Sequence, residues 1–367
     1  MNDILNTGIS NVKNPSRYIF GPGSINNLSK ILELRRNNSS SSSIFFVDHY
    51  FSKNDEFLKN LFLTKEDLLI FIQTDEEPTT EYVDKLVSEI KSKNLSVCAM
   101  VGIGGGSTLD IAKAVSNLLT NNGSASDYQG WDLVKNPGVF KIGVPTISGT
   151  GSEATRTCVI TNKKKKLKLG MNSDHSIFDQ LILDPNLTAT VPRDQYFFSG
   201  MDSYIHCIES LSGRYRNVIG DAYSRQALDL CRIVFFSENM QSDENRSNLM
   251  VASYLGGCAI ATSYVGLIHP FSAGLSIVLG IHHCEANCLA FRALGEFYKD
   301  EAKEFEEMRL KQKIVLKDNL CKNLNSDKLD ELYEATIVHE KPLTNALGYD
   351  FKDILTKEKV KSIFLKI

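Results

Sequence analysis

The stretch "VCAMVGIGGGSTLDIAKAVSNLLTN", residues 97–121, decides the fold class. Its first part is a continuous apolar run of the kind found in buried strands, and it ends in three glycines. The part from Ser107 onward has apolar residues at helical spacing, with Ser107 itself at the expected N-cap position. Strand, glycine turn and helix in this order predict a βαβ unit in a parallel sheet.

The pattern continues on both sides of this stretch. We expect strands at "SIFFVDHY" (43–50) and "VFKIGVPTIS" (139–148), and a helix at "TEYVDKLVSEIKSKN" (80–94). After "LILDPNLTATVPRDQ" (181–195) strand patterns stop, and long helical patterns cover 199–212, 219–236, 244–263, 271–295 and 298–321. The prediction is an α/β, Rossmann-like dinucleotide-binding domain over residues 1–184 and an all-α domain over 185–367.

Net charge, the N-terminal pattern and the cysteine spacing argue against several classes of function. Among 367 residues, the formal net charge of −3 argues against a nucleic-acid partner, and we interpret the run "KKKK" (163–166) as a solvated turn between strands. The N-terminal residues lack the pattern of a signal peptide, and no apolar run reaches the roughly 18 residues of a membrane span. The eight cysteines form no CxxC pair. We therefore expect a cytoplasmic protein with reduced cysteines and no membrane partner.

The glycine turn is the first candidate binding site. Gly104, Gly105 and Gly106 let the backbone approach a ligand closely. The helix that follows, with Ser107 in its first turn, offers free N–H groups and a positive partial charge to a pyrophosphate. The stretch is neither GxGxxG nor a Walker loop, so a plain turn remains the alternative.

Two further segments are candidates for the same cofactor. Asp48 closes an earlier strand, where a carboxylate can bind a ribose diol and repel a 2′-phosphate, which favours NAD over NADP. The segment "PTISGTGSEATRT" (145–157) follows another strand and offers the hydroxyls of Thr146, Ser148 and Thr150. A turn-forming aspartate and an ordinary polar loop are the respective alternatives.

The positions of the histidines suggest a metal site. Asp202 and His206 are four apart on a predicted helix and share one of its faces. His269 and His283 are the other two candidates, in the apolar segment "GLIHPFSAGLSIVLGIHHCEANC" (266–288). One carboxylate and three imidazoles suit Fe²⁺ or Zn²⁺ and leave room for a substrate oxygen. Each histidine taken singly could instead be a satisfied core residue.

Together these motifs resemble the iron-containing (group III) alcohol dehydrogenase family, whose fold dehydroquinate synthase and glycerol dehydrogenase share. The matching segments are "GGGSTLDIAKA", "PTISGTGSEAT" and "GMDSYIHCIE", followed by the interval from His269 to His283. The resemblance implies a divalent metal, Fe²⁺ or Zn²⁺, held by Asp202, His206, His269 and His283. It also implies NAD, with Asp110 of the first motif and Lys168, near the nicotinamide ribose, among the residues that bind it.

Closer resemblance is to a branch that oxidises the C8 hydroxyl of 3-deoxy-D-manno-octulosonate (Kdo) to an aldehyde. It is carried by "DYQGWDLVKNPGVFKIGVP", "TRTCVITN", "LKLGMNSDHSIFDQLILDP" and "HPFSAGLSIVLGIHHCEANC". The resemblance implies a sugar-acid substrate, an aminotransferase acting next in the pathway, and an 8-amino sugar destined for lipopolysaccharide. We also expect a homodimer.

Two positions depart from the family pattern. Ala273 stands where many members have a further histidine, so His282 is the candidate catalytic residue in its place. Cys284 stands where a glycine is usual. For the carboxylate of a sugar acid, Arg156, Arg193 and Arg214 are equal candidates.

The mechanism implied is hydride transfer from a metal-bound alcohol to NAD, in the cleft between the two domains. A small alcohol or 1,2-diol dehydrogenase, similar to lactaldehyde reductase, is the alternative. A lyase-type reaction is disfavoured because that branch uses a glutamate where this chain has Asp202. A binding module without catalysis would be expected to lack ligands that are present here. Whether NAD or oxygen is the final acceptor stays open.

Overall fold

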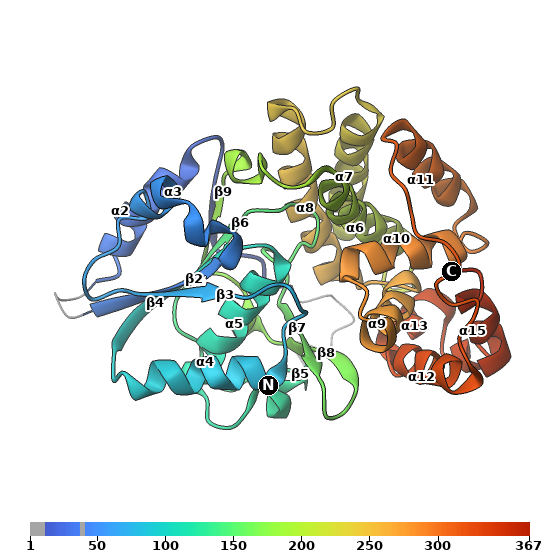
Figure 1. The fold of residues 1–367 in the computed structure, drawn as a ribbon, viewed down its shortest axis with the longest axis horizontal. Helices are drawn as coiled ribbons and strands as arrows, with labels where there is room; N and C mark the ends of the chain where they lie inside the picture. The colour runs from blue at the N-terminus through green and yellow to red at the C-terminus, as the bar shows by residue number, and fades with distance from the viewer. Residues whose placement is uncertain (1–11, 37–40) are drawn as a thin grey trace. The chain divides into compact units, whose positions relative to one another are not determined.

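The computed structural model describes residues 12–36 and 41–367 (Figure 1). The first eleven residues, where most of a signal peptide would lie, fall outside this part of the chain. Two compact units are present. An α/β unit comprises Asn14–Ser148 and Ser152–Thr190, and a helical unit comprises Gly149–Gly151 and Val191–Ile367.

The α/β unit is built on a six-stranded sheet in which every pair of neighbouring strands is parallel. The strands, in spatial order, are β1 (Arg17–Phe20), β9 (Gln180–Leu183), β6 (Lys141–Pro145), β4 (Ser96–Gly104), β2 (Ser41–Asp48) and β3 (Leu68–Ile72). Val47 pairs with Ile103, and Gly104 pairs with Pro145. The register therefore brings the carboxyl ends of β2, β4 and β6 to one edge of the sheet.

Both faces of this sheet are covered, as Figure 1 shows. Alternate residues of β2 point to opposite faces, because side chains of a strand alternate. Phe45 and Val47 pack with α2 (Leu28–Glu33) and α3 (Asp55–Lys59), whereas Ile44 and Phe46 pack with α4 (Thr80–Ser92) and α5 (Gly106–Thr120). A sheet buried on both faces explains why its strands are continuous apolar runs.

A second, three-stranded sheet has the order β5 (Gly130–Trp131), β8 (Leu167–Asn172) and β7 (Thr157–Asn162). β7 and β8 pair antiparallel, and the four lysines 163–166 form the turn between them. The prediction of a solvated turn is confirmed. Lys163 reaches Glu76 at 2.8 Å on the surface.

The glycine turn differs in one detail from the sequence-based expectation. α5 begins at Gly106 and its N-cap is Gly105, without a side-chain capping bond. The prediction that Ser107 caps the helix is wrong, because the helix starts before this residue. The glycine requirement is steric as well: a Cβ at Gly104 would lie 2.6 Å from Thr108 Cβ.

The described part of the helical unit consists of helices and their connections. The helices are α6 (Arg193–Ser212), α7 (Val218–Phe236), α8 (Asp243–Ser263), α9 (Ile268–Leu279), α10 (His283–Ala293), α11 (Lys299–Lys311), α12 (Ser326–Ile337), α13 (Glu340–Leu347), α14 (Phe351–Ile354) and α15 (Lys357–Phe364). The predicted single helix 271–295 is wrong: Gly280, with φ +68°, ends α9 in the left-handed conformation. The predicted helix 298–321 is too long, since α11 ends at Lys311.

The segment Gly149–Gly151 packs with the helices, although the chain around it belongs to the α/β unit. Gly149 N–H donates to Ser253 Oγ at 2.8 Å. A Cβ at Gly149, whose φ is +140°, would lie 1.6 Å from the Ser199 carbonyl oxygen. A Cβ at Gly151 would lie 2.7 Å from Gly257 Cα. These two glycines are needed for close contact with α6 and α8.

Within the described ranges, no single helix is long and apolar enough to cross a membrane. The pair α8 and α9 passes the same test of length and composition jointly, with a bend of 106° between its members. Side chains of both helices, including Leu249, Ala252, Phe271 and Leu275, belong to the hydrophobic core of the helical unit.

Candidate metal centre and cofactor site

Helix α6 places three ionisable side chains on one face. Asp202, His206 and Glu209 are spaced i, i+4 and i+7, and such residues project from the same side of a helix. All three are buried, with residue exposures of 3% or less. A buried helix face with two acids and one imidazole requires partners from neighbouring helices.

Those partners come from the break between α9 and α10. His269 lies in the first turn of α9, and His283 is the first residue of α10. Both helices pack in the same bundle as α6 (Figure 1). The His269 ring stacks on His206 with centroids 4.8 Å apart, and the His283 ring centroid is 5.6 Å from that of His269.

The three predicted histidine ligands converge on the carboxylate of Asp202, the fourth. Its Oδ1 lies 3.3 Å from His269 Nε2 and 3.4 Å from His206 Nε2, and its Oδ2 lies 3.8 Å from His283 Nε2. Ligand atoms about 2.1 Å from one tetrahedral metal lie about 3.4 Å apart, so these spacings fit. In the described part of the chain, Asp202, His269 and His283 form a group whose ligand atoms all lie within 4.8 Å of one another, and His206 is outside this group.

One atom in particular fits a metal. His269 Nε2 is buried and has no hydrogen bond of good geometry within the described part of the chain, even though Asp202 Oδ1 is 3.3 Å away. A buried polar atom left in this state is costly unless something else binds it. A divalent cation between the imidazoles and the carboxylate would satisfy this nitrogen, and the donor set of oxygen and imidazole nitrogen suits Fe²⁺ or Zn²⁺.

The protonation of these groups is tightly linked. Burial alone would raise the pKa of Asp202, but His206, His269 and His283 outweigh it and hold that pKa below its usual range. Burial lowers the pKa of His206 to about 4, against the opposing effect of Asp202. Burial would also lower the pKa of His269, yet Glu209 and Asp202 raise it to about 10. Asp202 is therefore a carboxylate and His206 a neutral imidazole at pH 7, as metal ligands must be, whereas His269 carries a proton on both ring nitrogens and must release the one on Nε2 when a metal binds.

Several residues contact these four, and of them the sequence analysis singled out Cys284 alone. Glu209 Oε2 lies 2.5 Å from His269 Nδ1. Asn287 Nδ2 donates to Asp202 Oδ1 at 2.6 Å. Ser272 Oγ lies 3.2 Å from His283 Nδ1, and Cys284 Sγ lies 3.9 Å from Asp202 Oδ2. Helical spacing from the predicted ligands could have indicated Glu209 and Asn287.

The cofactor candidates of the α/β unit gather at the carboxyl edge of the sheet. Asp48 ends β2, Gly105 follows β4, and Thr146 follows β6, with Thr146 N–H donating to the Gly104 carbonyl at 3.0 Å. Ser148 Oγ is buried without a hydrogen-bond partner among the described residues. A pyrophosphate and a ribose can be bound at such an edge, next to the N-terminus of α5.

Three other cofactor candidates already have partners of their own. Asp110 accepts from Ser152 Oγ at 2.6 Å and from Val159 N–H at 2.9 Å, and pairs with buried Lys113 at 3.2 Å. Lys168 Nζ is 3.1 Å from Glu77 Oε2. Thr150 lies between the two glycines that pack against α6 and α8.

The remaining candidates are more loosely placed. His282 is the N-cap residue of α10 and is exposed. Arg156 pairs with Asp132 and, at 3.3 Å, with Asp174. Arg193 donates to Gln312 at 2.8 Å, and the Arg214 guanidinium lies 4.8 Å from the ring centroid of Tyr349. The contacts do not single out one arginine for a substrate carboxylate.

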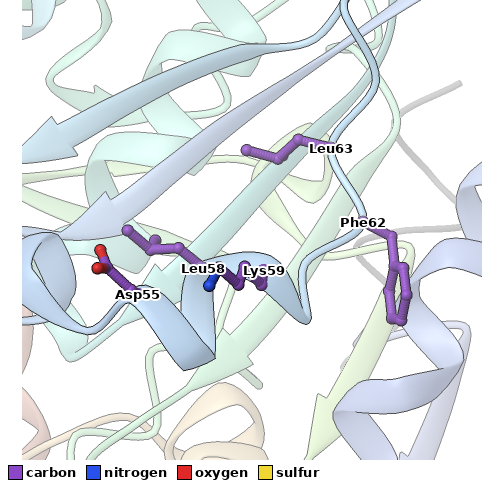
Figure 2. A pocket seen from close by; sticks show the side chains of 5 residues that line it. All are labelled: Asp55, Leu58, Lys59, Phe62 and Leu63. Carbon is purple, nitrogen blue, oxygen red and sulfur yellow. The ribbon is translucent and has the colours of Figure 1, made fainter.

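A surface hollow of about 370 Å³ lies along α3 and the residues after it (Figure 2). Figure 2 shows the side chains that line it, which are Asp55, Leu58, Lys59, Phe62 and Leu63. None of them is a candidate for the metal or the cofactor.

Models of one protein family match most of the chain. The model described as "Iron-containing alcohol dehydrogenase" matches residues 15–185, and the model for the C-terminal part of that family matches residues 197–345. The chain is 34% identical over 216 residues to sulfoacetaldehyde reductase of Bilophila wadsworthia, which covers 58% of this chain and 55% of that protein. It is 31% identical to the NAD-dependent methanol dehydrogenase of Bacillus methanolicus over 64% of this chain and 62% of that protein. The matches thus span between half and two thirds of these relatives.

The fold is shared over nearly the whole length. The structure of a 1,3-propanediol oxidoreductase superposes with a TM-score of 0.82 at 20% identity, covering 96% of this chain and 98% of that one. The predicted fold class, an α/β domain followed by a helical domain, is confirmed. The predictions of an oxidoreductase and of a divalent metal with NAD agree with the family description and with the names of these relatives. The chain belongs to the iron-containing alcohol dehydrogenase family.

Proposed function

We propose that this protein is a metal- and NAD-dependent dehydrogenase that oxidises a primary alcohol to an aldehyde. The observation that carries the proposal is the buried convergence of His206, His269 and His283 on Asp202. The reaction balances as alcohol plus NAD⁺ giving aldehyde, NADH and a proton. When bound, the metal would lower the pKa of the substrate hydroxyl, and NAD would accept the hydride.

The residues of the chain divide this work. Asp202 and the three imidazoles would hold the cation through one carboxylate and three nitrogens. Gly105 and the first turn of α5 would bind the pyrophosphate through backbone N–H groups. Asp48, at the end of β2, would accept the hydrogen bonds of the ribose.

The hydroxyl proton must also leave the site. Ala273, one helical turn after His269, has no side chain that could carry it. We assign this step to His282, whose exposed imidazole can exchange protons with water and whose neighbour in the sequence is His283. This residue is the proposed general base.

For the substrate we propose the C8 hydroxyl of Kdo, from the resemblance of four segments to that branch. Trp131, which is 44% exposed, belongs to one of these segments. In this proposal the enzyme is cytoplasmic and dimeric. The aldehyde is then consumed by an aminotransferase, and the 8-amino sugar enters lipopolysaccharide.

A small alcohol or 1,2-diol is the second candidate substrate. It is favoured by the relatives, whose names refer to methanol and sulfoacetaldehyde and not to a sugar acid. The same ligands and the same cofactor would serve both substrates, so the distinction depends on the space around the reacting carbon.

The test is a screen of Kdo, 1,2-propanediol and methanol with purified protein, in the presence and absence of NAD, in air and under nitrogen. NADH absorbance and aldehyde trapping are the measurements. NADH formation that requires the metal supports the proposal, whereas aldehyde formed only in air would assign oxygen as the acceptor. If the metal-loaded protein forms no aldehyde from any of these alcohols, the proposed function is rejected.

A paired variant locates the site. His283→Ala should lower metal affinity at least about 10-fold, because it removes a ligand. His282→Ala, at the adjacent position, should leave metal affinity unchanged, because its exposed side chain is outside the ligand set. Equal metal affinity in both variants and in the wild type would contradict the ligand assignment.

A further inference from the structure

Glu209 is a fully buried acid that the predicted ligand set does not include. Its Oε2 lies 2.5 Å from His269 Nδ1, and its Oε1 accepts from the Ile268 N–H at 2.5 Å. From these contacts we infer that Glu209 is a positioning residue of the metal centre: it fixes the ring of His269 with the proton on Nδ1, leaving Nε2 to bind the metal. The inference rests on the proposed metal-dependent function.

The contact determines where the proton lies. An ionised carboxylate can only accept hydrogen bonds, so the Nδ1 that faces it must carry a hydrogen. His269 Nε2 then faces Asp202 Oδ1 at 3.3 Å and has no well-formed hydrogen bond in the described part of the chain. A carboxylate bound to the far nitrogen also makes the imidazole a more basic ligand.

Glu209 also binds a backbone N–H group, which fixes the orientation of its carboxylate. Helix α9 begins at Ile268, and its N-cap Leu267 provides no side-chain capping bond. The carboxylate of Glu209 takes that place by accepting the Ile268 N–H, one of the free donors of a helix start. The same acid therefore fixes the start of α9 and the ring of His269 in its first turn.

The surroundings of Glu209 leave it little freedom. A Cβ at Gly266 would lie 3.3 Å from Glu209 Cβ, from its Cγ and from Tyr298 Oη. Even the smallest side chain at Gly266 would therefore press on the acid. A carboxylate held this closely keeps one orientation, and it therefore keeps the His269 ring in one orientation as well.

The test is Glu209→Gln in the full chain, stripped of metal and titrated with Co²⁺ and with Zn²⁺ under chelator competition. A glutamine has one oxygen where the glutamate has two, and its amide nitrogen is a donor. It cannot accept from both His269 and Ile268 in the observed arrangement. We expect the dissociation constant to rise about 10- to 100-fold, with a changed visible absorption spectrum of bound Co²⁺.

Tyr204→Phe is the matched control on the same helix. It deletes the hydroxyl that donates to Glu304 at 2.5 Å and touches none of the ligands, so it should lower the melting temperature without changing metal affinity. If Glu209→Gln does not fold, Glu209→Asp replaces it. That variant keeps the charge but is too short to reach both donors, and it should also weaken Co²⁺ binding.

The outcomes separate the two proposals. Wild-type metal affinity and an unchanged Co²⁺ spectrum in a folded Glu209 variant would overturn the role of Glu209 while leaving the metal site intact. A wild-type protein that binds neither Co²⁺ nor Zn²⁺ would overturn the proposed function itself. Weakened binding in Tyr204→Phe as well would assign the effect to the stability of α6 and so reject the positioning role.

Discussion

Asn287 donates a hydrogen bond to Asp202, with 2.6 Å between Asn287 Nδ2 and Asp202 Oδ1. The same nitrogen lies 3.3 Å from His283 Nε2, because Asn287 is one turn after His283 on α10. One fully buried amide therefore touches two proposed ligands from different helices. A neutral donor at this place stabilises the charged carboxylate without competing for the cation by charge.

Asn287→Ala should weaken metal binding about 10-fold, because Asp202 loses its neutral donor. The measurement is the Zn²⁺ dissociation constant by chelator competition. Asn117→Ala is the control: Asn117 is equally buried on α5 and donates to Ser176 Oγ at 2.9 Å, remote in sequence from every ligand. It should cost about 1–3 kcal/mol of stability and leave Zn²⁺ affinity unchanged. Unaltered affinity in Asn287→Ala would show that the amide has no influence on the ligands.

The sequence predicts the α/β unit well because its strands and helices follow from local patterns. The apolar run that ends at Gly104 and the helical spacing after it depend only on neighbouring residues. The break at Gly280 was missed because apolar residues continue at helical spacing on both sides of it. A glycine inside such a pattern is ordinarily tolerated, and only the φ of +68° shows that it ends a helix.

Part of the candidate metal centre was predictable because it also depends on a local sequence pattern. The i, i+4 spacing of Asp202 and His206 is local, whereas bringing His269 and His283 to them requires the packing of α9 and α10 against α6. Glu209 was missed although it lies on the same face of the same helix. Its spacing could have indicated that it lies near the ligands, but its contact with His269 Nδ1 depends on the packing of the helices.

Asp48 should decide the choice between NAD and NADP. Its carboxylate also caps the short helix that follows, accepting from Tyr50 N–H at 3.0 Å. Removal of the whole side chain would therefore change both the cofactor site and this helix cap. Asp48→Ser keeps a capping oxygen and removes the charge. We expect the ratio of NAD to NADP affinity to fall at least about 10-fold, with little change in stability. Calorimetry with both cofactors is the measurement, and an unchanged ratio would remove Asp48 from the cofactor site.

Asp67 should make the stability of the α/β unit depend on pH. Burial opposes the ionisation of Asp67, but the N–H groups of Thr64 and Ser43 and the guanidinium of Arg36 together lower its pKa below the usual 3.8. A carboxyl group with a lower pKa in the folded state stabilises the protein above its unfolded pKa of about 3.9. That contribution is lost as the pH falls through the folded pKa.

Asp67→Asn should therefore destabilise the protein by about 1.5–3 kcal/mol at pH 7, and the difference from wild type should shrink toward pH 3. Urea unfolding at pH 7, 5 and 3 measures this difference in the free energy of unfolding. Asp318→Asn removes an exposed pair with Arg292 and should change stability by less than about 1 kcal/mol throughout. A deficit of Asp67→Asn that does not depend on pH would show that the charge is unimportant.

Ala273 should distinguish the two candidate substrates. It lies on α9 one turn after His269 and is 8% exposed, so its side chain is almost completely enclosed. If this small residue makes room for a sugar acid, Ala273→His should crowd Kdo and at the same time supply an imidazole able to carry a proton. Turnover of 1,2-propanediol relative to Kdo should then rise at least about 10-fold, a change of about 1.4 kcal/mol in relative barrier.

The measurement is kcat/KM for both substrates in wild type, Ala273→His and Ala273→Leu. The leucine variant adds bulk without a titratable group, so it should lower Kdo turnover without raising turnover of the diol. If the leucine and histidine variants behave alike, size alone is the cause and no proton is carried from this position. If wild type ignores Kdo and oxidises propanediol well, the sugar-acid hypothesis is wrong, and the diol dehydrogenase reading replaces it with the same metal ligands and the same cofactor.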